Sequence, residues 1–177
     1  MAQSQSADER VIAPGVRLPS IALASTRGGM VDLSQLAGRS VVFVYPYTGR
    51  PGVPDPPGWD DIPGAHGSTP QAQGFGDQYG AFQAAGVEVY GLSGQASAWQ
   101  QEATRRLGLP YALLSDEGLN FAGALGLPRF AAGERLFLTR LTLLIADGNV
   151  TAIFHPVLDP AGHARAVLER IAPRVSS

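Results

Sequence analysis

The order of strand-like and helix-like segments predicts an α/β fold with a central mixed β-sheet, helices on both faces of the sheet and a β-hairpin near the N-terminus. Two observations carry this prediction. The β-branched and aromatic run at 41–45 is typical of a strand buried on both faces, and 138–145 is the second strong strand-like segment. Segments with helical periodicity alternate with further strand-like segments between these two runs.

The first expected element is a short hairpin, because the strand-like segments 21–25 and 30–33 flank the tripeptide Arg27-Gly28-Gly29. Glycine adopts the positive φ that a tight turn needs. Residues 34–38 predict one helical turn that ends at a glycine, and the buried strand 41–45 follows.

Residues 46–67 form a long loop, since six prolines and five glycines are interleaved there. Proline lacks the backbone N–H and glycine adds entropy to the unfolded chain, so the segment can be neither a helix nor a central strand. Ordered loops of this length are usually functional, although a flexible surface insertion is the alternative. Tyr47, Trp59 and Ile62 are the large apolar residues expected to anchor it.

A helix is expected from Thr69, because Phe75, Tyr79 and Phe82 have the spacing of one apolar helix face, and Gly86 ends it. The remaining elements follow in order. They are a strand at 87–92, a helix opened by a Ser97-to-Gln100 capping box and stopped at Gly108, a strand at 113–115, a small helix at about 119–125, the strand 138–145, a turn at 147–149, its hairpin partner 150–155, and a last helix opened by Asp159-Pro160.

The composition of the chain argues against nucleic-acid binding and against membrane association. Thirteen Lys and Arg against fifteen Asp and Glu, with no basic run, give no electrostatic footprint for nucleic acid or an anionic membrane. No apolar stretch approaches the roughly 20 residues of a membrane span. Residues 1–12 are expected to be a flexible polar tail without the apolar core of a signal peptide, residues 13–177 a single domain, and the cytoplasm the location.

The chain contains no cysteine, which excludes disulfides, thiolate metal sites and thiol chemistry as the sequence stands. Its three histidines are too scattered to predict a zinc site by spacing, so no metal is expected. His155 and His163 are interpreted as solvated or capping side chains.

Ser68 occupies the point where the long loop meets the predicted helix. A helix N-terminus has unpaired N–H groups and the positive end of the helix dipole. A small polar side chain there can cap the helix, hold an anion or act as a nucleophile, and these three roles stay open on local sequence alone.

The spaced motifs resemble the peroxiredoxins, thiol peroxidases of the alkyl hydroperoxide reductase and thiol-specific antioxidant superfamily. Within that family the chain looks closest to the Q type, also called bacterioferritin comigratory proteins. The resemblance covers nearly the whole chain and implies a thioredoxin-like fold. It is carried by residues 15–19, 31–38, 41–46, 67–71, 90–93, 109–116 and 140–148.

The resemblance places Ser68 at the position of the peroxidatic cysteine, Arg140 at that of the arginine beside it, and Pro46 at that of the proline that shields the thiolate. Gln73 falls where many Q-type members have the resolving cysteine. The family's threonine is out of register, because Ala65 stands at its position. Further candidates for the substrate pocket are therefore Thr48, Thr69 and Trp59.

The resemblance implies antioxidant reduction of hydrogen peroxide or organic hydroperoxides by a cysteine thiolate. A helix N-terminus and a nearby arginine lower the pKa of such a thiol, and the sulfenic acid that forms is returned by a second thiol. No cofactor is implied. The implied partners are the hydroperoxide and an external thiol reductant such as thioredoxin, glutaredoxin or a glutathione-like thiol, and the implied assembly is a monomer or homodimer.

Serine cannot perform this cycle, because its hydroxyl is not ionised near neutral pH and oxygen forms no sulfenic acid. The chain as written is therefore expected to be inactive. Either Ser68 is an engineered replacement of a cysteine, or the lineage lost its cysteines and kept the fold as a binding or regulatory protein. The intact flanking sequence, Gly67 and Thr69 to Gln71, favours the first explanation.

A different hypothesis makes Ser68 a hydrolase nucleophile, with His66 as base and Asp60 or Asp61 as the group that orients it. This hypothesis rests on proximity in the sequence alone, because the chain lacks a Gly-x-Ser-x-Gly motif around Ser68.

Overall fold

The structure is a computed structural model that describes residues 12–171. Seven strands form one mixed sheet in the order β2-β1-β5-β4-β3-β8-β9, and β6 and β7 form a separate hairpin. The strands are β1 (Ala22–Ser25), β2 (Met30–Asp32), β3 (Arg39–Val44), β4 (Val87–Ser93), β5 (Ala112–Ser115), β6 (Arg129–Ala132), β7 (Arg135–Leu138), β8 (Leu141–Ala146) and β9 (Asn149–Phe154). The predicted mixed sheet and the N-terminal β1–β2 hairpin are confirmed.

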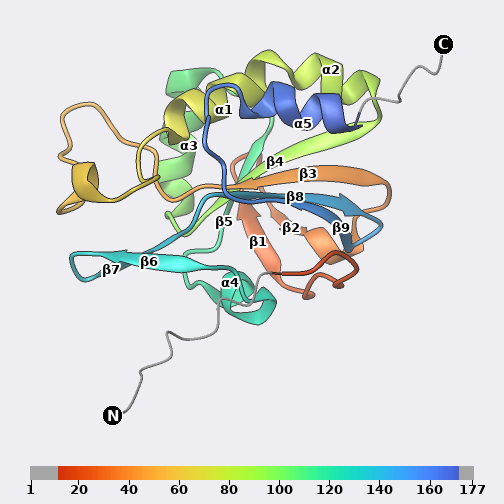
Figure 1. The fold of residues 1–177 in the computed structure, drawn as a ribbon, viewed down its shortest axis with the longest axis horizontal. Coiled ribbons are helices and arrows are strands. Elements are labelled where there is room, and N and C mark those ends of the chain that lie inside the picture. The colour runs from red at the N-terminus through yellow and green to blue at the C-terminus, as the bar shows by residue number, and fades with distance from the viewer. Residues whose placement is uncertain (1–11, 172–177) are drawn as a thin grey trace.

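The helices lie on both faces of the sheet, as predicted (Figure 1). They are α1 (Ser68–Asp77), α2 (Tyr79–Ala84), α3 (Ser97–Leu107), α4 (Asn120–Leu125) and α5 (His163–Ile171), with single 3-10 turns at η1 (Leu33–Gln35) and η2 (Trp59–Asp61). None of the helices within residues 12–171 is long and apolar enough to cross a bilayer.

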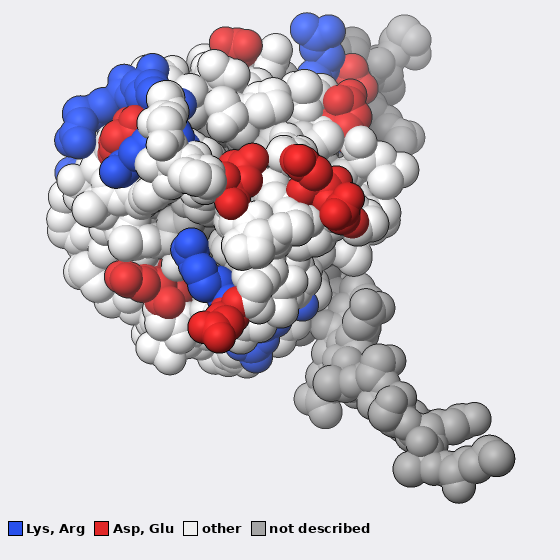
Figure 2. All heavy atoms as spheres, turned by 90° about the vertical axis from the view of Figure 1, so that its left-hand side faces the viewer, with Lys and Arg blue, Asp and Glu red and all other residues white. Residues whose placement is uncertain are grey.

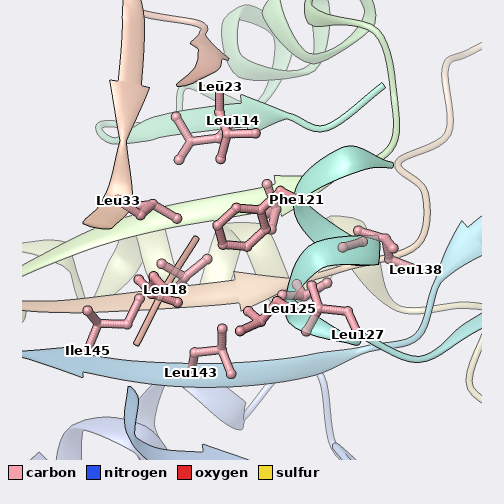
Figure 3. Close-up of a cluster of buried hydrophobic side chains, with 14 of the residues drawn as sticks. Leu18, Leu23, Leu33, Leu114, Phe121, Leu125, Leu127, Leu138, Leu143 and Ile145 are labelled. Carbon is pink, nitrogen blue, oxygen red and sulfur yellow. The ribbon is translucent and has the colours of Figure 1, made fainter. Parts of the chain in front are cut away.

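Two hydrophobic clusters, one on each face, hold the sheet between its helices. Alternate residues of β3 divide between them: Val41 and Phe43 point toward α1, α2 and α5, whereas Val42 and Val44 point toward α4. The cluster on the α4 face includes Phe121 and is drawn in Figure 3. Because β3 is covered on both sides, its continuous apolar run is the expected sequence for this position.

The sheet topology brings three carboxyl ends to one edge. β3, β4 and β5 are parallel neighbours, while β8 is antiparallel to β3. The chain after β3, β4 and β5 therefore leaves the sheet at the same edge, on the side where the 46–67 loop and the β6–β7 hairpin extend in Figure 1.

The 46–67 loop is held by an aromatic cluster. Tyr47, Trp59 and Phe137 are buried together, and the rings of Trp59 and Phe137 meet edge to face with centroids 4.9 Å apart. The predicted anchors Tyr47 and Trp59 are thus confirmed, with Ile62 packed partly buried against them.

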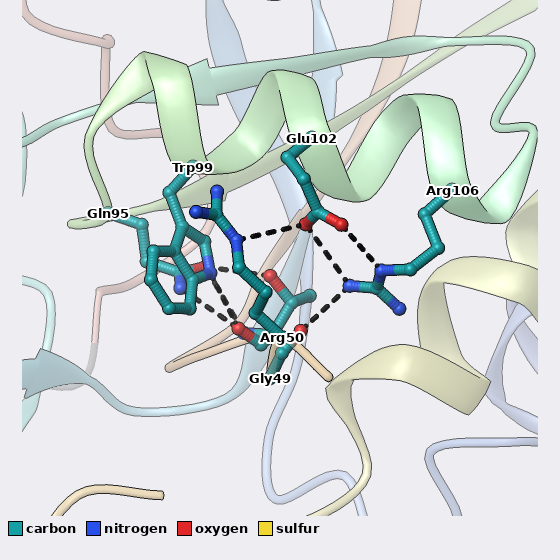
Figure 4. Close-up of polar contacts among 7 residues, drawn as sticks. Gly49, Arg50, Gln95, Trp99, Glu102 and Arg106 are labelled. Carbon is teal, nitrogen blue, oxygen red and sulfur yellow. Dashed lines mark hydrogen bonds and ion pairs between the residues drawn. The ribbon is translucent and has the colours of Figure 1, made fainter. Parts of the chain in front are cut away.

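The base of the loop is also tied to α3 (Figure 4). Glu102 accepts from Arg106 at 2.7 Å and pairs with Arg50 at 3.4 Å. Arg106 donates in addition to the carbonyl of Gly49. These contacts connect the first residues of the loop to the helix surface.

Three predicted boundaries are wrong. The run 138–145 is not one strand, because its first residue ends β7, paired with β6, and the chain joins the main sheet only at Leu141. The last helix begins at His163, since a turn closed by Asp159 and the carbonyl of Pro160 precedes it. Ser97 is no capping box, because it already lies inside α3.

Two further predictions change in detail. The helix expected from Thr69 to Gly86 is divided at Gln78 into α1 and α2. His163 is neither solvated nor capping: it is 7% exposed, and its Nε2 lies 2.8 Å from the Thr142 hydroxyl. Of the expected tail 1–12, only Ile12 is among the described residues, and it is buried in the core.

Candidate functional site

Ser68 is the first residue of α1 and is 2% exposed. The residue that caps the helix is Gly67, with φ of 114°, and no side chain provides the cap. The capping role considered for Ser68 is therefore wrong. Its hydroxyl instead lies at the positive end of the helix, where the first N–H groups have no partner within the helix.

Arg140 lies in the break between β7 and β8 and reaches Ser68 from the sheet. It is 5% exposed, and its Nη2 donates to Ser68 Oγ at 3.1 Å. The same nitrogen also faces the carbonyls of Gly64, Ala65 and His66 at 3.2 to 3.4 Å. Because Nη2 carries two hydrogens, these four acceptors share them, and the shortest contact is the one to serine.

Gln71 completes the arrangement and was missed by the sequence analysis. Its Oε1 accepts from Arg140 Nη1 at 2.5 Å, and the side chain is fully buried. Helical spacing could have found it, because a residue three positions after Ser68 lies on the same helix face. Gln71 Nε2 and Arg140 Nε are buried without a hydrogen-bond partner among the described residues.

The electrostatics of this site favour an anion. Burial lowers the pKa of Arg140 to about 10, so the guanidinium remains charged at neutral pH. Within residues 12–171 it forms no ion pair with a carboxylate. A buried cation together with a helix N-terminus can stabilise a negative charge that develops at position 68.

Gly67 fits this site for two reasons. Its positive φ is one that residues with a Cβ rarely adopt. In addition, a Cβ at position 67 would lie 2.7 Å from the ring of Pro160, in the segment before α5. The start of α1 is therefore packed directly against the chain that leads into the last helix.

The other predicted residues lie around this site or away from it. Pro46 is buried directly after β3, Thr69 is half-buried beside Ser68, and Gln73 is exposed on α1. Thr48 is directed elsewhere, because its hydroxyl and N–H both donate to Gln95 Oε1. Trp59 is buried in the aromatic cluster that anchors the loop.

The structure contains one of the two contacts that the hydrolase hypothesis requires. His66 Nε2 lies 2.6 Å from Asp60 Oδ1, as an oriented base would require. The hydrogen bond recorded for Ser68 Oγ, however, comes from Arg140 and not from His66. A base must be within hydrogen-bond reach of the proton it removes, so the geometry disfavours this hypothesis.

The same histidine belongs to a group of possible metal ligands. Donor atoms of Asp55, Asp60 and His66 lie within 4.8 Å of one another, and all three residues are exposed. The spacing of the histidines in the sequence did not predict this group. The ion pair between Asp60 and His66 already accounts for the approach of these two side chains.

Comparisons with known proteins agree on one family. The family described as Redoxin matches residues 13–169. Peroxiredoxin Q, chloroplastic, from Oryza sativa subsp. japonica is 33% identical over 159 residues, which are 89% of this chain and 66% of the rice protein. The chain thus spans just under two thirds of that relative. The chloroplastic peroxiredoxin Q of Sedum lineare is 31% identical over 159 residues, 89% of this chain and 77% of its own.

Solved structures show the same fold. The crystal structure of peroxidoxin BcpB from Mycobacterium tuberculosis superposes with a TM-score of 0.73 at 22% identity, and covers 93% of this chain and 98% of its own. At this identity the likeness concerns the fold.

Proposed function

The chain belongs to the redoxin family and is a peroxiredoxin of the Q type, and we propose that it is an inactive, serine-substituted form of a thiol-dependent peroxidase for hydrogen peroxide and organic hydroperoxides. Ser68 occupies the peroxidatic position in this proposal. The observation that carries it is the 3.1 Å contact between Arg140 Nη2 and a buried Ser68 Oγ at the start of α1.

A sulfur atom at position 68 would find the groups that its chemistry needs. Arg140 and the N-terminus of α1 would stabilise the thiolate, whose pKa they lower from about 8.5. The thiolate attacks one peroxide oxygen, the O–O bond breaks, and the departing oxygen leaves as water or an alcohol after protonation. Arg140 can donate to that developing negative charge.

The reductant in this proposal is an external thiol, such as thioredoxin, glutaredoxin or a glutathione-like compound. Gln73, proposed to lie at the resolving position, is exposed on α1 and offers no thiol. Pro46, buried after β3, would limit access of water to the thiolate. Thr69, beside Ser68, is the candidate to contact the peroxide.

Replacement of Ser68 by cysteine tests the proposal. We expect the S68C protein to consume hydroperoxide with a reducing thiol, and its thiol pKa to fall below the ordinary value of about 8.5. Ser97→Cys is a matched control, since Ser97 also begins a helix, α3, but its recorded hydroxyl contact is with Gln101. Equal reactivity of the two cysteines would contradict the proposal.

The second candidate function is a cysteine-less binding or regulatory protein, and the complete absence of cysteine from the chain favours it. It predicts a ligand or partner retained by the unchanged chain, detectable as a rise in melting temperature. For either function we propose a cytoplasmic protein that is a monomer or homodimer. The rice and Sedum relatives, in contrast, are named as chloroplastic.

A further inference from the structure

A cavity lies at the edge where the parallel strands end, away from the residues of the proposed peroxidase site. Its volume is about 470 Å³. Tyr47 follows β3, Gln95 follows β4 and Leu119 follows β5, and all three line it. The β6–β7 hairpin contributes to its rim Glu134 from the turn and Leu136 from β7. We call this cavity the strand-end pocket.

The strand-end pocket differs from the Ser68 site in position and construction. Ser68, Gln71 and Arg140 do not line it. In open α/β sheets, ligands bind outside the carboxyl ends of the strands, and pockets for small ligands have volumes of about 300–1,000 Å³. Both the place and the size of this pocket therefore suit a small organic molecule.

One wall of the strand-end pocket is apolar and fixed. The indole of Trp99 is held by a 2.7 Å hydrogen bond from its Nε1 to the carbonyl of Thr48. Its ring packs 5.6 Å from the ring of Tyr47 and is also stacked by the guanidinium of Arg50. Leu136, at the rim, is 51% exposed. A ligand with an aromatic or aliphatic body would cover this wall and bury Leu136.

Backbone strain is found in the same wall. Leu119 has φ of 56°, a conformation that residues other than glycine rarely adopt. Its side chain approaches Gly94, where an added Cβ would lie 2.9 Å from Leu119 Cδ2. Residues held in such conformations are concentrated at binding and active sites.

The charges at the rim favour a cation. Glu117 and Glu134 line the pocket from two different segments, and neither has an ion-pair partner within residues 12–171. The one lining cation is Arg135, whose guanidinium lies 5.1 Å over the ring of Phe137. Arg50, behind Trp99, is paired with Glu102.

Two carboxylates and one guanidinium give the lining a net charge of −1. Figure 2 shows the face on which the loop and the hairpin lie, where acidic and basic groups are interspersed. We propose that the strand-end pocket binds a small molecule that has a protonated amine on an aromatic or aliphatic body. The amine contacts Glu117 and Glu134, and the body covers Trp99, Tyr47 and Leu136.

Three probes of similar shape and different charge test this inference on the unchanged chain: phenethylammonium, 2-phenylethanol and 3-phenylpropanoate. Binding is followed by two-dimensional amide NMR. We expect saturable shifts at residues 94–96, 117–119 and 134–136, with the ammonium about fivefold tighter than the alcohol and the carboxylate weakest. Equal affinity of the three probes, or shifts that centre on residues outside the pocket, would overturn the proposal.

Variants separate charge from shape. The double substitution Glu117→Gln and Glu134→Gln should remove the roughly fivefold preference for the ammonium and leave alcohol binding unchanged. Glu169→Gln, on the exposed surface of α5, is the matched control and should change neither. If the double variant keeps the preference for the ammonium, the assigned carboxylates are wrong.

A charge reversal at the rim gives a test of opposite sign. Because Leu136 is half-exposed, Leu136→Lys should leave the fold intact, weaken the ammonium and strengthen the carboxylate by about fivefold each. Leu136→Lys does not alter Ser68 or Arg140. The proposed peroxidase site is tested separately, by hydroperoxide consumption of the S68C protein, so the two proposals can fail independently. Unchanged probe affinities in a folded Leu136→Lys protein would refute the pocket assignment.

Discussion

The Ser68 site and the strand-end pocket lie at the same end of the sheet but differ in construction: the first is closely packed and the second is open. At the Ser68 site the guanidinium of Arg140 donates to Ser68 and Gln71, and all three residues are at most 5% exposed. The strand-end pocket has about 470 Å³ of space, an aromatic wall and charges at its rim. The first suits the proposed stabilisation of charge on one atom, and the second suits the proposed binding of a small molecule.

The difference follows from the elements that build each site. A helix start and an arginine in a break between strands give fixed, short contacts at the first site. Strand ends and a hairpin turn give an open cavity at the second. We therefore expect substitutions at one site to leave the other unaffected.

The largest expected effect concerns Arg140. In the S68C background, Arg140→Ala should slow the reaction with hydroperoxide at least tenfold, and by 10²- to 10³-fold if the guanidinium stabilises the departing oxygen in full, about 3–4 kcal/mol. Stopped-flow measurement of peroxide consumption tests this.

Arg135→Ala in the same background is the matched control, because Arg135 lines the strand-end pocket instead. It should leave the rate unchanged. A similar loss of peroxide consumption rate in both variants would contradict the conclusion that the two sites act independently.

The next effect compares one glycine from each site. Gly67→Ala should cost about 3 kcal/mol of unfolding free energy, because it combines a positive φ with contact of the Pro160 ring. Gly94→Ala should cost about 1 kcal/mol, since the atom in its way is the end of the Leu119 side chain, which can move. Urea unfolding of both variants gives the comparison, and equal costs would contradict it.

A pH dependence is expected on the Ser68 side of the molecule. Burial, and then the charge of Arg140, lower the pKa of His163 from 6.5 to about 4. Between these values the unfolded chain binds a proton that the folded chain does not. Stability should therefore fall as the pH falls from 6.5 to 4, by about 3 kcal/mol.

Urea midpoints of the unchanged chain and of His163→Gln, measured at pH 7 and pH 4.5, test this assignment. The variant should lose less stability on acidification. His155→Gln, at an exposed position, should behave like the unchanged chain. Identical pH slopes for all three proteins would rule out His163 as the cause.

The smallest expected effect concerns the attachment of α1 to the sheet. The buried hydroxyl of Tyr111 donates to the carbonyl of Ala72 at 2.6 Å. Tyr111→Phe should cost about 1 kcal/mol in urea unfolding and leave probe affinity at the strand-end pocket unchanged. A change in probe affinity would show that the two sites are coupled through β5.

Much of the fold could be predicted because local patterns and tertiary structure agree. The run 41–45 is apolar on both faces, and β3 lies in the middle of the sheet. The β6–β7 hairpin could not be predicted in this way. The apolar residues 136–138 are separated from β8 only by Thr139 and Arg140, with no proline or glycine between them. Only the pairing of β7 with β6 reveals that the chain changes sheets there.

The site was predicted in part. The pairing of Ser68 with Arg140 followed from the family resemblance, and the structure brings the two side chains together. Gln71 was within reach of helical spacing, whereas the burial of His163 depends on how α5 packs against the sheet after folding. The strand-end pocket depends on three strand ends that are distant in sequence, so no local pattern could indicate it.

The contact between Gly67 and Pro160 has a consequence for hydrogen exchange. We expect that the first turn of α1 cannot unwind without displacing the segment that leads into α5, because the backbone at Gly67 lies against the ring of Pro160. The amides of Ser68 and Thr69 should therefore exchange through the same opening event as those at the start of α5. Two helix starts separated by almost a hundred residues would then report a single opening free energy.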